Sequence, residues 1–241
     1  MFLERLARLL RKTSRSTSQT TGKVSANNSS TQNTVIQERK RVDPAHIGDL
    51  GEFKVNVQLR QFEKGSQYLT DLLLPNSRSK TGYSQIDHVL VTQYAIFVIE
   101  TKNYDGTIRG KRMDKYWQVN GKFSIYNPLR QNYGHIKTLQ EILKEFSDID
   151  FVSIVSFTKR CKALYIDQEL RNIEANELVV YDIKLTDIID TKLRKLSLSK
   201  SSPPLSQASV ERIVEIISMK NITDPQIRVE HVNRITKSKN H

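Results

Sequence analysis

Two runs of strand-forming residues, Gln85–Thr92 and Ala95–Lys102, are separated by only Gln93 and Tyr94. So short a connection allows the two runs to pair only as an antiparallel hairpin. If Thr92 faces Ala95, then Asp87 lies directly opposite Glu100, and a four-residue loop would keep the same pairing. Two like charges directly opposed on a ladder are destabilising, so this pair of carboxylates requires an explanation.

A divalent cation held between the two carboxylates supplies that explanation. Mg²⁺ binds one or two protein carboxylates, keeps several waters and leaves positions for phosphate oxygens. Lys102 projects on the same face as Glu100, because side chains alternate along a strand. Metal-assisted cleavage of a phosphodiester uses such a trio, with the lysine orienting the attacking water or stabilising the developing negative charge. Spacing alone equally allows a solvent-facing cluster in which Lys102 only neutralises the carboxylates.

The elements around this hairpin predict an α/β domain with a mixed central sheet flanked by helices. A helix should begin after Asp43 at Pro44, run to about Phe62 and present Leu50, Phe53 and Val57 on one face. Asn120-Gly121 predicts a tight two-residue hairpin turn between 116–119 and 122–125. The other expected strands are 68–74, 106–110, 151–157, 163–166 and 178–181, and the other expected helices are 128–146, 185–195 and 208–219.

The N-terminal part of the chain is polar and basic. Residues 1–42 carry nine Lys or Arg and two Glu, so they hold +7 of the formal charge of +12 and leave +5 for the other 199 residues. Residues 1–12 predict a short basic amphipathic helix, which either contacts an anionic membrane surface or a partner's groove, or frays and packs weakly. In residues 13–34, 17 of 22 are Ser, Thr, Asn or Gln, which predicts a disordered linker over 13–42.

A single cysteine excludes a disulfide framework and a multi-cysteine zinc site, and we expect Cys161 to be an inert apolar residue. The longest apolar run, Tyr94 to Ile99, is far shorter than the ~20 residues that cross a bilayer. These features predict a cytoplasmic protein, peripheral to the membrane if residues 1–12 bind there.

Five groups of residues, in order, resemble the nuclease-related domain (NERD) family across about Ala45 to Leu143. They are Gly48–Glu52, Gln85–His88, Val98–Asn103, Gly106–Ile108 with Trp117, and Asn127–His135. That family is similar to the PD-(D/E)xK restriction-endonuclease-like superfamily, whose core is a mixed sheet flanked by helices. The resemblance therefore implies a restriction-endonuclease-like core and a nuclease acting on DNA.

The same resemblance implies roles for five residues of the chain. Asp87 and Glu100 would bind the metal, Mg²⁺ or Mn²⁺ in its place, and Lys102 would orient the attacking water. Glu52, on the first helix, would reach the same metal cluster, and Gln131 would face the site from a later helix.

Several other residues have two readings that the sequence leaves open. His88 should point to the face opposite Asp87 and be packed or hydrogen-bonded there. His135 lies four residues after Gln131 and hence on the same helix face, where it serves either the site or helix packing. Tyr116 and Trp117 either stack on bases or pack a small hairpin, which carries the basic residues Lys111, Arg112, Lys115 and Lys122.

We divide the chain into residues 1–12, 13–42, a nuclease-related core 43–150, a completion of the α/β domain 151–222, and a tail 223–241. Two functions remain open. The first is a Mg²⁺-dependent DNA nuclease. The second is a non-catalytic module that binds nucleic acid or a partner and is held at a membrane surface by residues 1–12.

Overall fold

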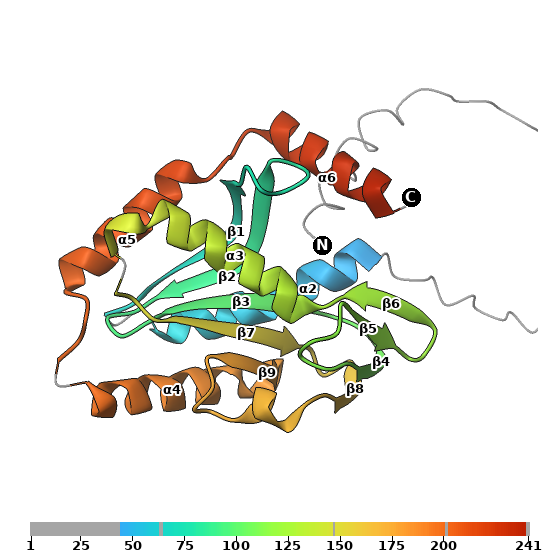
Figure 1. The fold of residues 1–241 in the computed structure, drawn as a ribbon, viewed down its shortest axis with the longest axis horizontal. Helices are drawn as coiled ribbons and strands as arrows, with labels where there is room; N and C mark the ends of the chain where they lie inside the picture. Colours follow the sequence, from blue (N-terminus) through green and yellow to red (C-terminus); the bar gives the residue numbers. More distant parts are fainter. Residues whose placement is uncertain (1–43, 63–64, 147, 201, 240–241) are drawn as a thin grey trace, which may run out of the picture.

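A mixed sheet of five strands forms the centre of the computed structural model, which describes residues 44–62, 65–146, 148–200 and 202–239 (Figure 1). The strand order is β1-β2-β3-β7-β9, and we call this sheet A. The bounds are β1 Gln67–Pro75, β2 Tyr83–Val91, β3 Ile96–Lys102, β7 Phe151–Phe157 and β9 Glu177–Tyr181. The first three strands are antiparallel, whereas β3, β7 and β9 are parallel, which confirms the predicted mixed sheet. The expected N-terminal helix, the linker and Asp43 lie outside the described residues.

The predicted hairpin register is confirmed. His88 pairs with Ile99 and Val91 with Ile96, so Asp87 and Glu100 are opposed one step beyond the last paired residues. The amide of Thr92 donates to the carbonyl oxygen of Ala95 at 3.1 Å, which closes the connection around Gln93 and Tyr94.

Helices cover both faces of sheet A. On one face, α3 (Pro128–Ile142) and α5 (Gln207–Lys220) pack on buried side chains that include Val89 and Val98. On the other face, α2 (Pro44–Leu59) and α4 (Leu185–Ser199) cover residues that include Phe97 and Ile99. Four short 3₁₀ helices lie at Arg60–Phe62, Lys144–Phe146, Gln168–Arg171 and Asp182–Lys184. No helix in the described ranges is both long and apolar enough to cross a bilayer.

The buried face of α2 differs from the predicted one. Leu50, Phe53 and Val57 are 47%, 61% and 44% exposed, and the buried positions are Gly48, Gly51, Val55 and Leu59. A Cβ added to Gly51 would lie 3.2 Å from the Cβ of Asn103, so the helix approaches the end of β3 more closely than a larger residue would permit. The face that packs combines a close backbone approach at Gly51 with the apolar side chains of Val55 and Leu59.

A second, smaller sheet lies beyond the carboxyl ends of β3 and β7 (Figure 1). Its order is β6-β5-β4-β8, with β4 Gly106–Arg109, β5 Tyr116–Val119, β6 Phe123–Tyr126 and β8 Cys161–Tyr165, and we call it sheet B. Trp117 is fully buried on its inner face, and its ring stacks on Phe157 with centroids 6.3 Å apart.

The turn of the β5–β6 hairpin is one residue longer than predicted. Asn120 and Gly121 have the positive φ angles that the dipeptide predicts, but Val119 pairs with Phe123, which places Lys122 in the loop. This register sets Trp117 opposite Ile125, so two apolar side chains enter the core together. A two-residue turn would have put Ser124 in that position.

The C-terminal segment that we set apart as a tail contains the helix α6, Pro225–Lys239. The Asp224 side chain accepts the amide hydrogen of Gln226 at 2.7 Å and so caps its first turn. The guanidinium of Arg228 donates to both carboxylate oxygens of Asp71 at 3.0 Å and to the Asp71 carbonyl oxygen at 2.9 Å. This fork ties α6 to β1.

Candidate active site

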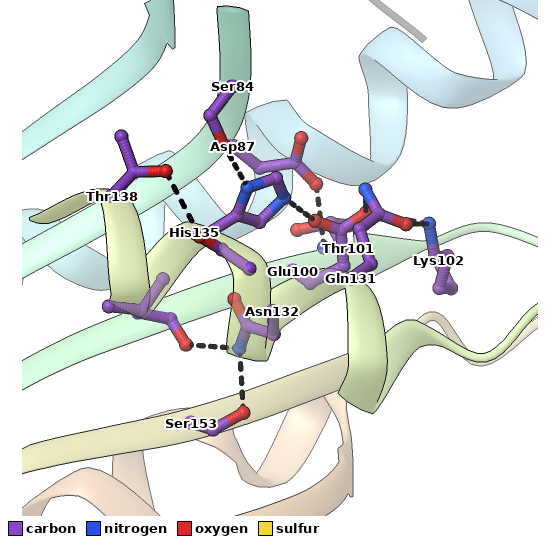
Figure 2. Close-up of polar contacts among 12 residues, drawn as sticks. Ser84, Asp87, Glu100, Thr101, Lys102, Gln131, Asn132, His135, Thr138 and Ser153 are labelled. Carbon is purple, nitrogen blue, oxygen red and sulfur yellow. Dashed lines mark hydrogen bonds and ion pairs between the residues drawn. The ribbon is translucent and has the colours of Figure 1, made fainter. Parts of the chain in front are cut away.

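Asp87 and Glu100 lie near the carboxyl end of β3, next to the point at which β2 begins to pair with β3 (Figure 2). Oδ2 of Asp87 accepts the amide hydrogen of Thr101 at 2.8 Å, which fixes the carboxylate toward β3. Glu100 is only 2% exposed, whereas Asp87 is half-buried. The strand register thus brings together the two residues that the sequence predicted as metal ligands.

Three side chains surround the Glu100 carboxylate (Figure 2). Lys102 Nζ donates to Oε1 at 2.6 Å, and Gln131 Nε2 donates to the same oxygen at 2.8 Å. His135 Nε2 lies 3.4 Å from the other oxygen, Oε2. Lys102 Nζ also donates to Gln131 Oε1 at 3.1 Å. Gln131 therefore faces the site, as the resemblance implied, and it contacts both charged groups.

Helix α3 is held in register with the site by its asparagines. Asn127 caps its first turn, because its Oδ1 accepts the amide hydrogen of Leu129 at 2.9 Å. Asn132 is buried and donates to the Val98 carbonyl oxygen and to Ser153 Oγ, both at 2.8 Å, so it spans β3 and β7. These contacts place Gln131 and His135, one helical turn apart, above the end of β3.

His135 lies against the Glu100 carboxylate, on the same helix face as Gln131. Ser84 Oγ lies 2.7 Å from Nδ1, on the side of the ring away from Glu100. When the Ser84 hydroxyl donates to Nδ1, the Nε2 hydrogen lies on the side of Glu100, although Nε2 and Oε2 form no hydrogen bond among the described residues. Ser84 was not predicted as a site residue, because its contact depends on where α3 crosses β2.

The ionisable residues of the site fall into two groups. Glu100 and Lys102 stabilise each other's charged forms, whereas Asp87 and Glu52 both have raised pKa values. Although burial opposes ionisation of both groups, Lys102 lowers the pKa of Glu100 to about 2, and Glu100 raises the pKa of Lys102. Burial, followed by the charge of Glu100, raises the pKa of Asp87 to about 6. Burial, followed by the charge of Asp87, raises the pKa of Glu52 to about 8. Glu52, on α2, is half-buried and is influenced by the charge of Asp87.

This donor set fits a hard divalent cation. Carboxylate oxygens are the ligands that Mg²⁺ and Mn²⁺ take, and Mg²⁺ needs only one or two of them. The raised pKa values of Asp87 and Glu52 show that ionising these carboxylates is costly in the protein alone, with Lys102 offsetting the cost at Asp87 only in part, and a bound cation would favour their ionised forms. In the described part of the chain, no three His, Cys, Asp or Glu side chains already converge at metal-binding distances. Full ligation would require Glu52 to move toward the pair.

Two other candidates lie away from the charged cluster. His88 is 1% exposed and faces the opposite side of its strand from Asp87, and burial lowers its pKa to about 3, so it stays neutral. Trp117 is buried in sheet B, which excludes it from stacking on bases, whereas the neighbouring Tyr116 is 50% exposed.

Part of the chain is similar to a known protein family. Residues 47–158 match the family model of the nuclease-related domain, and this range contains every predicted site residue. An uncharacterized protein of Bacillus anthracis is 29% identical over 199 residues, which cover 80% of this chain and 85% of that protein. The crystal structure of AF1548, a protein of unknown function, covers 71% of this chain and 96% of its own at 10% identity, with a TM-score of only 0.29. Residues 47–158 are therefore identified as a nuclease-related domain (NERD).

Proposed function

We propose that the protein is a nuclease that hydrolyses phosphodiester bonds in DNA and depends on a divalent cation, Mg²⁺ or Mn²⁺. The observation that supports this most directly is the opposed pair of Asp87 and Glu100 with the Lys102 ammonium 2.6 Å from Glu100. A purely structural ion pair needs one carboxylate, and the second one is costly without a cation.

In this proposal the residues of the site have two roles, cation binding by the carboxylates and hydrogen bonding by Lys102 and Gln131. Asp87, Glu100 and Glu52 would hold the cation, which when bound polarises the scissile phosphate and lowers the pKa of a coordinated water. Lys102 stays an ammonium and donates hydrogen bonds to the attacking water or to the phosphate oxygen on which negative charge develops. Gln131 accepts one of the Lys102 hydrogens and so fixes where the ammonium points.

Substitution of Asp87 by Ala tests the proposal. We expect cleavage of DNA in Mg²⁺ to fall by at least about 100-fold, because a ligand of the cation is lost. Calorimetric titration with Mn²⁺ should show weaker binding by the same variant. Glu141→Ala is the matched control, since Glu141 is an exposed carboxylate on α3 that pairs with the exposed Arg78. The proposal is wrong if the wild-type protein in Mg²⁺ leaves single-stranded and duplex DNA and RNA intact.

One observation favours a second function, a non-catalytic binding module. Glu100 is already surrounded by Lys102, Gln131 and His135, an arrangement that stabilises the carboxylate without any metal. In that case neither Mg²⁺ nor a chelator would change the melting temperature. As part of this alternative we propose a cytoplasmic protein held at a membrane surface by residues 1–12. Deletion of residues 1–42 should then release it from anionic vesicles and leave the melting temperature of the folded domain unchanged.

A further inference from the structure

One face of sheet B is not covered by apolar side chains from the rest of the described chain. The pairings place Tyr126 beside Tyr116, Ser124 beside Gln118, Gln118 beside Arg109, and Arg109 beside Tyr165. Directly paired residues project to the same side of a sheet, and side chains two apart along a strand do as well. These six residues therefore share one face, which we call the open face. The inner face holds Ile108, Trp117, Ile125 and Leu164 in the core.

The open face is unusually aromatic for a surface in contact with solvent. Tyr116, Tyr126 and Tyr165 are 50%, 47% and 54% exposed. The rings of Tyr116 and Tyr126 meet edge to face with centroids 6.1 Å apart, so they form a continuous patch. Exposed aromatic patches of this kind mark binding surfaces, because burying them on a partner removes apolar area from water.

Cations stand over the same rings. The guanidinium carbon of Arg109 lies 4.1 Å from the ring centroid of Tyr165, and Lys115 Nζ lies 5.4 Å from that of Tyr116. None of the six residues of the open face is acidic. Flat rings that alternate with positive charge complement a chain of unpaired bases that alternate with phosphates. A duplex offers the phosphates but hides the faces of its bases, so the rings would contribute nothing to duplex binding.

Sheet B lies at the same end of the molecule as the candidate active site. Gly106 begins β4 four residues after Lys102, and Cys161 begins β8 four residues after β7 ends. Sheet B thus follows directly after the carboxyl ends of β3 and β7, and Glu100 and Lys102 lie at that end of β3 (Figure 1).

We infer that the open face of sheet B binds single-stranded DNA by stacking unpaired bases on Tyr116, Tyr126 and Tyr165 while Arg109 and Lys115 contact phosphates. This surface guides the strand toward the candidate active site, and in that respect the inference rests on the proposed function. Binding itself does not require catalysis, so the two can be tested separately.

The test measures fluorescence anisotropy of a labelled oligothymidylate of about 20 nucleotides, in EDTA so that cleavage is excluded. Tyr165→Ala, and the double variant Tyr116→Ala/Tyr126→Ala, should each bind at least about tenfold more weakly than the wild type. A labelled duplex of the same length should bind with an affinity that these substitutions change by less than about twofold. Arg109→Gln and Lys115→Gln should each reduce the slope of log affinity against log salt by about 0.7.

Tyr133→Ala is the matched control. Tyr133 lies on α3 rather than on sheet B and is 56% exposed, and the Nζ of a neighbouring lysine, Lys137, lies 5.4 Å from its ring centroid. Its removal should leave oligothymidylate binding unchanged. Because all the substituted tyrosines are about half exposed, the variants should keep the melting temperature of the wild type, which circular dichroism checks.

The outcomes separate this inference from the proposed function. Tyrosine-dependent binding of oligothymidylate without any cleavage in Mg²⁺ supports the inference and contradicts the proposed function. Cleavage of single-stranded DNA with a KM that the tyrosine variants do not raise overturns the inference and supports the proposed function. Failure of the wild type to bind oligothymidylate, or equal losses for Tyr133→Ala and the open-face variants, overturns the inference as well.

Discussion

Glu52 retains its proton at a pH at which a free glutamic acid would have lost it. Its pKa is raised to about 8 by burial and by Asp87, so between about pH 4.5 and pH 8 the folded protein binds more protons than the unfolded chain. The stability from this residue is complete at the acid end and is lost as pH rises through the folded pKa. A cation at the site would remove this loss, because it favours the ionised carboxylate.

Glu52→Gln cannot ionise, so the variant should become more stable relative to the wild type as pH rises from 5 to 8 in EDTA. We expect a gain of roughly 2 kcal/mol, less than full linkage gives, because Glu52 is partly exposed. Urea unfolding at several pH values measures it, with Glu141→Gln, a substitution at an exposed carboxylate of α3, as the control variant. A difference in the free energy of unfolding between wild type and Glu52→Gln that stays constant across this pH range would contradict the raised pKa of Glu52.

At the scale of residues, the sequence predicted contacts that follow from chain connectivity. The opposition of Asp87 and Glu100 follows from a two-residue connection, and the place of Lys102 follows from alternation. The contact of Ser84 with His135 could not be predicted from the sequence, because it joins β2 to α3. The way in which α3 crosses β2 is set by contacts of Asn127 and Asn132 rather than by a local sequence pattern.

At the scale of elements, the position of α2 decides whether Glu52 reaches the site. Gly51 is in contact with Asn103 and Thr158 at the ends of β3 and β7, and an added Cβ would lie 3.2 Å and 3.3 Å from their side-chain atoms. Gly51→Ala should therefore displace the helix by a few tenths of an ångström.

We expect Gly51→Ala to lower the cleavage rate by about three- to tenfold, because small misplacements of a ligand weaken catalysis. Gly134→Ala provides the control, since Gly134 is also helical but has no atom within 4 Å of an added Cβ. That substitution should keep full activity and raise the free energy of unfolding by roughly 0.5–1 kcal/mol. Equal activity of the two variants would show that the approach of α2 is not needed.

The elements that were misjudged share a physical cause. The packed face of α2 is built on Gly48 and Gly51, so a search for large apolar residues selected the exposed face instead. Helix α6 was missed because its core contacts are dominated by the charged Arg228 rather than by an apolar stripe. Its start was readable, since Asp224-Pro225 repeats the Asp-Pro signal by which α2 was predicted.

At the scale of the whole molecule, the α6 contact joins the C-terminal end of the described chain to the far edge of sheet A. Arg228 is 8% exposed and donates to Asp71, to the Ile222 carbonyl oxygen at 2.7 Å and to the Asn221 side chain at 3.2 Å. Arg228→Leu would leave the carboxylate of Asp71 partly buried beside an apolar side chain.

We expect Arg228→Leu to lower the free energy of unfolding by about 2–3 kcal/mol, toward the low end for a broken buried pair because Asp71 keeps some contact with water. Arg234→Ala, which removes only the exposed pair with Glu230 on the same helix, should cost less than about 0.5 kcal/mol. Urea denaturation followed by circular dichroism gives both values. Similar costs for the two variants would show that α6 is not anchored through Arg228.

The stacking of Trp117 on Phe157 has a practical consequence. It is the single tryptophan of the chain, and it is fully enclosed where sheet B meets the end of β7. Its emission spectrum therefore serves as a built-in, label-free reporter of that junction. Detachment of sheet B from the rest of the domain would move the emission maximum toward the red while the far-ultraviolet signal of the helices persists, so local opening and global unfolding can be told apart optically.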